Sequence, residues 1–182
     1  LRTSSAASDV YKRQVKGVNE LFGTSFTIPA DRIEAGTYLV AAAVTNGSIT
    51  IDGINPNRLM KVINMIERSG PKISFDDNSI SISMNKDRPD PVDITTAPFP
   101  EFPTDMQAQF SVINAISSGV SNIYETVFEN RFMHILELNR MGCDIEVKGN
   151  HAIIKGVESI YGAEVMATDL SCLLYTSDAA DD

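Results

Sequence analysis

The 182-residue chain has no tryptophan, only two cysteines and two histidines, and far fewer basic than acidic residues. Two cysteines cannot make a disulfide framework for a chain of this length. A net charge of −9, without a basic cluster, argues against a nucleic-acid-binding protein. Apolar runs never reach the roughly 18 residues that a membrane-spanning helix needs. What remains is an ordinary globular composition, 43% hydrophobic, which excludes a disordered chain.

The two ends of the chain are unlike the segment between them. Codons can be chosen for residues 4–14 so that their reverse complement, read one base out of frame, encodes residues 172–182. Unrelated protein termini have no reason to be linked in this way, and both runs resemble the translated adapter of a sequencing library. We therefore predict that residues 1–14 and 172–182 are adapter artefacts and that residues 15–171 are a partial domain.

An internal repeat with a period of about 70 residues runs through residues 15–171. The sequence NRLM at 57–60 recurs as NRFM at 130–133. Both copies begin a helical pattern that ends in glycine, at Gly70 and Gly142, and both are followed by two strand patterns. Because a repeat of this length is a single supersecondary unit, the segment is predicted to be built from copies of one unit.

Periodicity and turn residues predict that one unit has the order β-α-β-α-β-β. A helix begins near Asp31, whose spacing from Glu34 is that of a capping box, and runs to about Thr45, where Gly47 stops it. A short strand follows, and a second helix begins with Pro56 in its first turn. Two strands then form a hairpin, and the one complete unit is predicted over residues 99–155. A helix between two strands predicts parallel pairing in an α/β sheet.

The proline-rich stretch 87–103 leads into the next predicted helix. Thr104 and Gln107 have the spacing of a capping box, which places Asp105 in the first turn. Two interpretations of Asp105 stay open on these residues alone. Its charge could complement the helix dipole, or its carboxylate could accept a proton from a substrate hydroxyl under the proline-rich loop.

A second candidate site lies between a strand that ends near Glu125 and a helix that begins near Asn130. Junctions at the carboxyl ends of parallel strands are common places for α/β sites. Glu129 and Arg131 could flank an anionic substrate, with the guanidinium bound to a carboxylate or phosphate. They could equally form a local ion pair that orders the junction, an interpretation that Arg58, at the same repeat position, supports.

The remaining reactive residue types carry little signal. No group of histidines, cysteines and carboxylates has metal-ligand spacing, so no metal is expected. His134 is predicted on a helix face and His151 in a hairpin. Cys143 follows a helix end, has no basic residue nearby in sequence, and is predicted to be structural. The sequence contains no glycine-rich phosphate loop and no Ser-His-Asp arrangement.

Four longer motifs occur in order: DRIEAGTYLVAAA at 31–43, FPTDMQAQF at 102–110, ETVFENRFMH at 125–134 and VMATDL at 165–170. With these motifs the segment resembles the enolpyruvyl transferase family, in particular the members that act on UDP-N-acetylglucosamine. The resemblance implies an α/β fold, the inside-out α/β barrel of that family, built from β-α-β-α-β-β repeats and incomplete here. Its partner would be the missing N-terminal part of the same chain.

The resemblance implies transfer of enolpyruvyl from phosphoenolpyruvate to the 3-hydroxyl of UDP-N-acetylglucosamine, a step of peptidoglycan precursor synthesis in the cytoplasm. By matching motif positions, Asp105 is the base at the sugar hydroxyl, and Val127 contacts the nucleotide sugar through its backbone. Arg131 helps to hold phosphoenolpyruvate, with Glu129 close to the reacting centre. No cofactor, nucleic acid or membrane is implied.

The segment departs from the family pattern at two places. The family usually has an arginine after the motif at 168–170, where this chain has Ser171 at the boundary of the predicted adapter. The proton-donating cysteine or aspartate of the family would lie in the missing part, and Cys143 does not match it. The chain alone is therefore expected to be inactive. The alternatives are another enolpyruvyl transferase, such as the 3-phosphoshikimate enzyme, and a non-catalytic repeat domain that binds a nucleotide sugar.

Overall fold

The computed structural model describes residues 16–166, which fall into two units. Residues 16–30 form the described part of the first unit, are exposed and contain no helix or strand. The second unit begins at Asp31 and contains every helix and strand of the described residues. The two predicted adapter runs, the motif at 168–170 and Ser171 lie outside the described residues. No helix among residues 16–166 is long and apolar enough to cross a membrane.

The second unit contains two successive copies of the predicted repeat. The elements of the first copy are α1 (Arg32–Val44), β1 (Ser48–Asp52), the 3-10 helix η1 (Pro56–Arg58), α2 (Met60–Arg68), β2 (Lys72–Phe75) and β3 (Ser79–Ser83). The elements of the second copy are β4 (Ile94–Thr95), the 3-10 helix η2 (Thr104–Met106), α3 (Gln107–Ala115), β5 (Val120–Tyr124), α4 (Met133–Arg140), β6 (Asp144–Lys148) and β7 (His151–Lys155). The predicted β-α-β-α-β-β order is confirmed, but the complete copy begins at β4, inside the proline-rich stretch.

The two copies pair their strands in the same register. Ser48 faces Ser83 in the first copy, and Val120 faces Lys155 in the second, so corresponding positions lie 72 residues apart. The hairpins β2–β3 and β6–β7 keep the same spacing. The strand orders are β1-β3-β2 in one sheet and β4-β5-β7-β6 in the other. Residues related by this register are called equivalent below.

Among the strands that the structure describes, the prediction of parallel pairing is correct for one pair only. β4 and β5, which are joined through α3, pair in parallel. β1 and β2 also point in one direction, but β3 lies between them and pairs antiparallel with both. β7 separates β5 from β6 in the same way. A short hairpin turn lets the last strand of each copy pair back at once, and this strand takes the central place.

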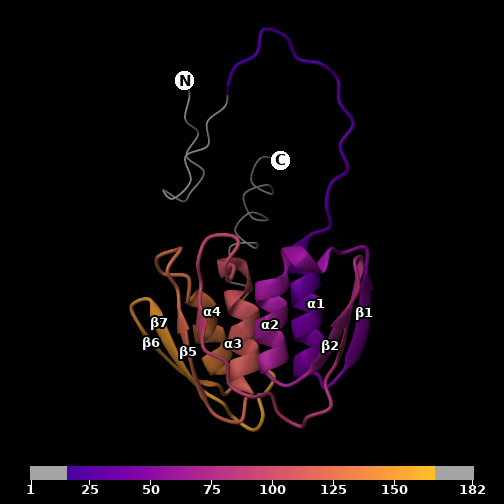
Figure 1. Cartoon of the computed structure of the whole chain (residues 1–182). Helices are drawn as coiled ribbons and strands as arrows, with labels where there is room; N and C mark the ends of the chain where they lie inside the picture. The colour runs from indigo at the N-terminus through magenta and orange to yellow at the C-terminus, as the bar shows by residue number, and fades with distance from the viewer. Residues whose placement is uncertain (1–15, 167–182) are drawn as a thin grey trace. The chain divides into compact units, whose positions relative to one another are not determined.

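Figure 1 shows the four helices side by side, with the strands of the first copy to one side and those of the second copy to the other. α1 packs against α2 and α3, and α3 packs against α4. One apolar core unites both copies and includes the fully buried Leu39, Ile66 and Phe110. Burial of each such side chain stabilises the fold by about 1.5–3 kcal/mol. Gly36 of α1 lies close to η2, because a Cβ there would lie 3.0 Å from the Met106 sulfur and would displace that side chain.

The helix ends confirm two sequence predictions and correct one. Asp31 caps α1, and its Oδ1 accepts hydrogen bonds from two backbone N–H groups at 2.7 and 3.4 Å. α1 ends at Val44, before Gly47 as predicted, and Asn46 takes the left-handed conformation, with a φ of 53°. The predicted capping box at Thr104 is wrong, because Pro103 occupies the N-cap position of η2 and no side chain caps it. The Thr104 hydroxyl instead donates a hydrogen bond to Glu125.

Candidate functional site

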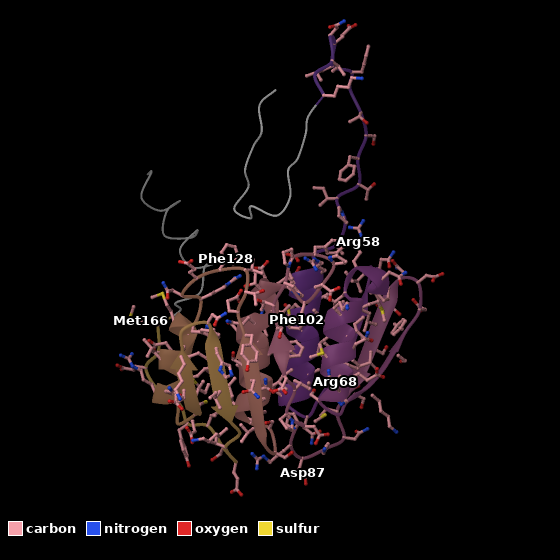
Figure 2. The ribbon with its side chains drawn as sticks, turned by 60° about the vertical axis from the view of Figure 1, so that its left-hand side comes forward. Arg58, Arg68, Asp87, Phe102, Phe128 and Met166 are labelled. Atoms are coloured by element: carbon pink, nitrogen blue, oxygen red, sulfur yellow. The ribbon has the colours of Figure 1, made fainter. Side chains whose placement is uncertain are left out.

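Three segments of the second copy meet at one end of the helices: the start of η2 and α3, the loop that follows β5, and the start of α4. Figure 2 labels Phe128, from the loop after β5, near this end, together with Arg58 of the first copy, whereas Asp87 lies at the opposite end. These segments bring together the residues predicted from the sequence, which are Asp105, Val127, Glu129 and Arg131.

The carboxylate of Glu125 organises this end of β5. The residue is 2% exposed, and its two oxygens accept hydrogen bonds from four donors. Oε1 accepts from the Thr96 hydroxyl at 2.7 Å and from the backbone N–H groups of Val127 and Phe128 at 2.9 and 3.1 Å. Oε2 accepts from the Thr104 hydroxyl at 2.7 Å. Because a buried carboxylate needs such partners, Glu125 ties the loop after β5 to the start of α3.

Thr104 connects this buried carboxylate to two charged residues that the sequence indicates. Arg131 Nη1 donates to Thr104 Oγ1 at 2.9 Å and forms an ion pair with Asp105 Oδ1, also at 2.9 Å. The guanidinium lies over the Phe128 ring, 5.3 Å from its centroid. The Arg131 side chain is 10% exposed and that of Asp105 is 55% exposed. A largely buried guanidinium therefore holds an accessible carboxylate in the first turn of η2.

The other two predicted residues lie on the same loop. Glu129 is exposed, and its side chain makes no hydrogen bond or ion pair with the residues that the structure describes. An ion pair does order the junction, but among the described residues it joins Arg131 to Asp105, from η2, and not to Glu129. Val127 is half-buried and its N–H donates to Glu125. Its carbonyl oxygen is the backbone group that remains for a ligand.

This arrangement can bind an anion and accept a proton. The guanidinium of Arg131 can donate paired hydrogen bonds to a phosphate or carboxylate. The exposed carboxylate of Asp105 can accept a hydrogen bond from a substrate hydroxyl and then its proton. Among residues 16–166, no group of three or more His, Cys, Asp and Glu side chains is placed to hold a metal ion.

The histidines and Cys143 lie outside this network. His134 is on α4, as predicted, and its Nε2 is 3.3 Å from the Ser111 hydroxyl. His151, in the predicted hairpin, stacks on Tyr124 with ring centroids 4.2 Å apart. Cys143 is buried, and burial raises the pKa of its thiol. A thiol with a raised pKa is rarely ionised, which agrees with a structural role.

Sequence reasoning does not single out Glu125 or Thr104 as site residues. It treats Glu125 as a strand end and Thr104 as a helix cap. Their hydrogen-bond partners lie 29 and 21 positions apart in the chain, so no local pattern reveals them. A signal does exist in the repeat, because the residue equivalent to Glu125 is Gly53, at the same point after β1. Because only the second copy has a glutamate where the first has a turn glycine, this difference marks the second copy as specialised.

Known proteins resemble this chain over most of its length. The family model of EPSP synthase (3-phosphoshikimate 1-carboxyvinyltransferase) matches residues 5–171. The UDP-N-acetylglucosamine 1-carboxyvinyltransferase of Haemophilus ducreyi is 52% identical over 156 residues, which are 86% of this chain and 37% of that protein. The protein of the same name from Coxiella burnetii is 48% identical over 169 residues, 93% of this chain and 38% of that protein. The chain thus spans less than two fifths of these relatives.

Two solved structures share the fold. The enolpyruvyl transferase NikO from Streptomyces tendae has a TM-score of 0.64 at 22% identity, covering 72% of this chain and 31% of its own. EPSP synthase from Acinetobacter baumannii has a TM-score of 0.55 at 12% identity, covering 71% and 30%. The predicted fold class is therefore confirmed, and it is that of the enolpyruvyl transferases. Within that class, the chain belongs to the EPSP synthase family, whose model covers most of its length.

Proposed function

We propose that this chain is part of an enzyme that transfers enolpyruvyl from phosphoenolpyruvate to the 3-hydroxyl of UDP-N-acetylglucosamine. The observation that carries the proposal is the accessible Asp105 carboxylate, held by Arg131, in a chain about half identical to proteins of that name. Such an enzyme would act in the synthesis of a peptidoglycan precursor, in the cytoplasm, and without a cofactor.

The proposed reaction is an addition followed by an elimination. The sugar 3-hydroxyl oxygen bonds to C2 of phosphoenolpyruvate, the hydroxyl gives up its proton, and C3 gains one. Loss of phosphate from C2 and of a proton from C3 then restores the double bond. Asp105 accepts the hydroxyl proton in the first step. Its exposure leaves room for the sugar, and the guanidinium beside it holds the carboxylate in place.

The other site residues bind and orient the substrates in this proposal. Arg131 donates hydrogen bonds to the anionic oxygens of phosphoenolpyruvate, with Glu129 close to the reacting carbon. The Val127 carbonyl accepts a hydrogen bond from the nucleotide sugar, because its N–H already donates to Glu125. The proton donor to C3 belongs to the N-terminal part of the enzyme. Cys143 does not take that role, because it is buried in the core.

A chimaeric enzyme tests the proposal. Residues 16–166 replace the matching segment of the Haemophilus ducreyi relative, which is 52% identical over 156 residues. We expect this chimaera to release phosphate and form the enolpyruvyl sugar from phosphoenolpyruvate and UDP-N-acetylglucosamine. A chimaera that melts cooperatively but forms no product would overturn the proposal. If it does not fold, the same graft into the Coxiella burnetii relative provides the test.

The same assay separates the two alternatives. Transfer to 3-phosphoshikimate in place of the nucleotide sugar would identify another enolpyruvyl transferase, the activity for which the matching family model is named. Binding of the nucleotide sugar without turnover would indicate a non-catalytic binding domain. The proposal also takes residues 15–171 as the enzyme segment. A genomic reading frame that encodes residues 1–14 and 172–182 as they stand would contradict that boundary.

A further inference from the structure

The hydrogen bonds from Glu125 to Arg131 have only one possible direction. An arginine side chain can donate but cannot accept, so Thr104 Oγ1 must accept from Arg131 Nη1. A threonine hydroxyl has a single hydrogen, and that hydrogen is then committed to Glu125 Oε2 at 2.7 Å. A carboxylate is the partner that fits, because it only accepts. The three side chains therefore form a relay in which hydrogen-bond donation runs from Arg131 through Thr104 to the buried Glu125.

The far end of the relay is the ion pair of the proposed active site. The same Nη1 atom that donates to Thr104 contacts Asp105 Oδ1 at 2.9 Å. This atom therefore has one hydrogen-bond acceptor and one ion-pair partner, which are neighbouring residues of η2. Glu125 also binds the N–H groups of Val127 and Phe128, and Phe128 lies under the guanidinium. The orientation of Arg131 is fixed from two sides by one carboxylate.

The first copy of the repeat lacks the relay. The residue equivalent to Glu125 is Gly53, and the residue equivalent to Thr104 is Arg32. The matching arginine of the NRLM motif, Arg58, is exposed, and its side chain makes no hydrogen bond or ion pair with residues 16–166. The arginine is therefore present in both copies, but only the copy with a buried glutamate holds it in one orientation.

We propose that Glu125 is a positioning residue that acts through Thr104 to orient Arg131 against Asp105. The inference rests on the proposed function for its effect on turnover, but the orientation itself can be measured without substrate. Without the relay, the side chains of Asp105 and Arg131 are both still present, but the orientation of Arg131 relative to Asp105 is expected to vary. A displacement of reacting groups of about 1 Å can lower a rate by roughly 10²-fold.

Two substitutions of Thr104 in the chimaera separate the relay from simple packing. Thr104→Val keeps the shape of the side chain and removes the hydroxyl, whereas Thr104→Ser keeps the hydroxyl and removes a methyl group. We expect Thr104→Val to lower kcat by roughly 10-fold to 100-fold with a melting temperature near that of the parent. Thr104→Ser is expected to retain most of the activity. A purely structural role predicts losses that follow the melting temperatures instead.

A second readout does not depend on turnover. The side-chain Nε–H signal of Arg131, assigned by its loss in Arg131→Lys, reports the order of the guanidinium in a ¹⁵N spectrum of the chimaera. We expect an ordered side chain in the parent and in Thr104→Ser, and an averaged one in Thr104→Val. Arg58 is the internal control, and its signal should be averaged in all three proteins.

The outcomes distinguish this inference from the proposed function. An ordered Arg131 signal and unchanged kcat in Thr104→Val would overturn the relay and leave the enzyme assignment intact. A folded parent that turns over no substrate would overturn the proposed function, and the loss of Arg131 order in Thr104→Val would still support the relay. If Thr104→Val does not fold, Glu125→Gln gives the same test. An amide nitrogen in the place of Oε2 cannot accept a hydrogen bond from the Thr104 hydroxyl.

Discussion

The loops that follow β1 and β5 have the same backbone connections and different chemistry. Gly53 N donates to Asn78 O at 2.8 Å in the first copy, and Glu125 N donates to Asn150 O at 2.9 Å in the second. Each loop has an arginine two residues before the α-helix that follows it, Arg58 before α2 and Arg131 before α4. The scaffold is therefore repeated, whereas the buried carboxylate and its hydrogen bonds occur in the second copy only.

This difference shows how one junction of a repeated fold becomes a site. Gly53 has a φ of 80° and no side chain, so the first loop is held by backbone hydrogen bonds and by the exposed Asn55 side chain, which accepts from the Asn57 N–H. The second loop is held by the Glu125 carboxylate as well. An arginine that is fixed in orientation can select a ligand geometry, whereas an exposed arginine such as Arg58 offers charge without direction.

The largest effect is expected at Asp105, which has no charged counterpart in the first copy. In the chimaera, Asp105→Asn should lower kcat by roughly 10²-fold to 10⁴-fold, the usual contribution of a general base, with little change in melting temperature. Asp52→Asn, an exposed carboxylate at the end of β1, is the matched control and should leave turnover unchanged. Near-parental activity of Asp105→Asn would remove Asp105 from the mechanism.

The two loops should also differ in their contribution to stability. Glu125→Ala leaves four donors without their acceptor and is expected to lower the free energy of unfolding by about 3–5 kcal/mol. In Gly53→Ala, at the equivalent position, the added methyl group has no atom within 4 Å. The free energy of unfolding should fall only because of the positive φ, by about 1–2 kcal/mol. Denaturant unfolding of the chimaera and both variants measures the two values. Equal losses would show that the Glu125 hydrogen bonds add no stability.

The matching arginines of the two copies, Arg131 and Arg58, should differ in their effect on substrate binding. Arg131→Lys removes the planar fork and should raise the KM for phosphoenolpyruvate and lower kcat/KM by roughly 10-fold to 100-fold. Arg58→Lys changes an exposed side chain and should alter kcat/KM by about twofold or less. Steady-state kinetics of the two variants test this. Similar losses in both would mean that the first junction also contacts substrate.

The smallest effect concerns pH and the hairpin of the first copy. Hydrogen bonds from the Asn78 N–H and the Ser79 hydroxyl lower the pKa of Asp76. A lowered folded-state pKa stabilises the protein above the ordinary aspartate pKa, and this contribution disappears as the pH falls through the folded value. Asp76→Asn should therefore lower the melting temperature at pH 7, and this difference should shrink as the pH falls below the ordinary aspartate pKa. Asp77→Asn is the neighbouring control, and a difference that persists in acid would contradict the assignment.

Much of the fold could be predicted because its signals are local. Helix caps such as Asp31, helix-ending glycines such as Gly70 and the alternating hairpin strands each occupy a few adjacent residues. The two-residue strand β4 is too short to show a pattern within a proline-rich stretch. The position of β3 and β7 between their neighbouring strands could not be predicted either. The pattern of a strand shows which residues share a face, but not which strands lie beside it in the sheet.

The site could be predicted only in part. The motif that contains Glu129 and Arg131 and the motif that contains Asp105 are readable, and the resemblance to a family assigns their roles. That Asp105 and Arg131 touch is a tertiary fact, since 26 residues separate them and the contact depends on the packing of α3 beside α4. The Thr104 hydroxyl has the spacing of a cap but binds the buried Glu125, because a buried carboxylate needs its donors more than an exposed helix end does.

A crystal structure of the chimaera with UDP-N-acetylglucosamine would test the central claim most directly. The claim is that the junction between β5 and α4 forms part of the catalytic site, and that the junction between β1 and α2 does not. The account predicts that the sugar 3-hydroxyl lies within hydrogen-bond distance of an Asp105 carboxylate oxygen, with the Thr104–Arg131 hydrogen bond retained. A sugar hydroxyl placed beside Arg32 and Arg58, away from Asp105, would contradict it.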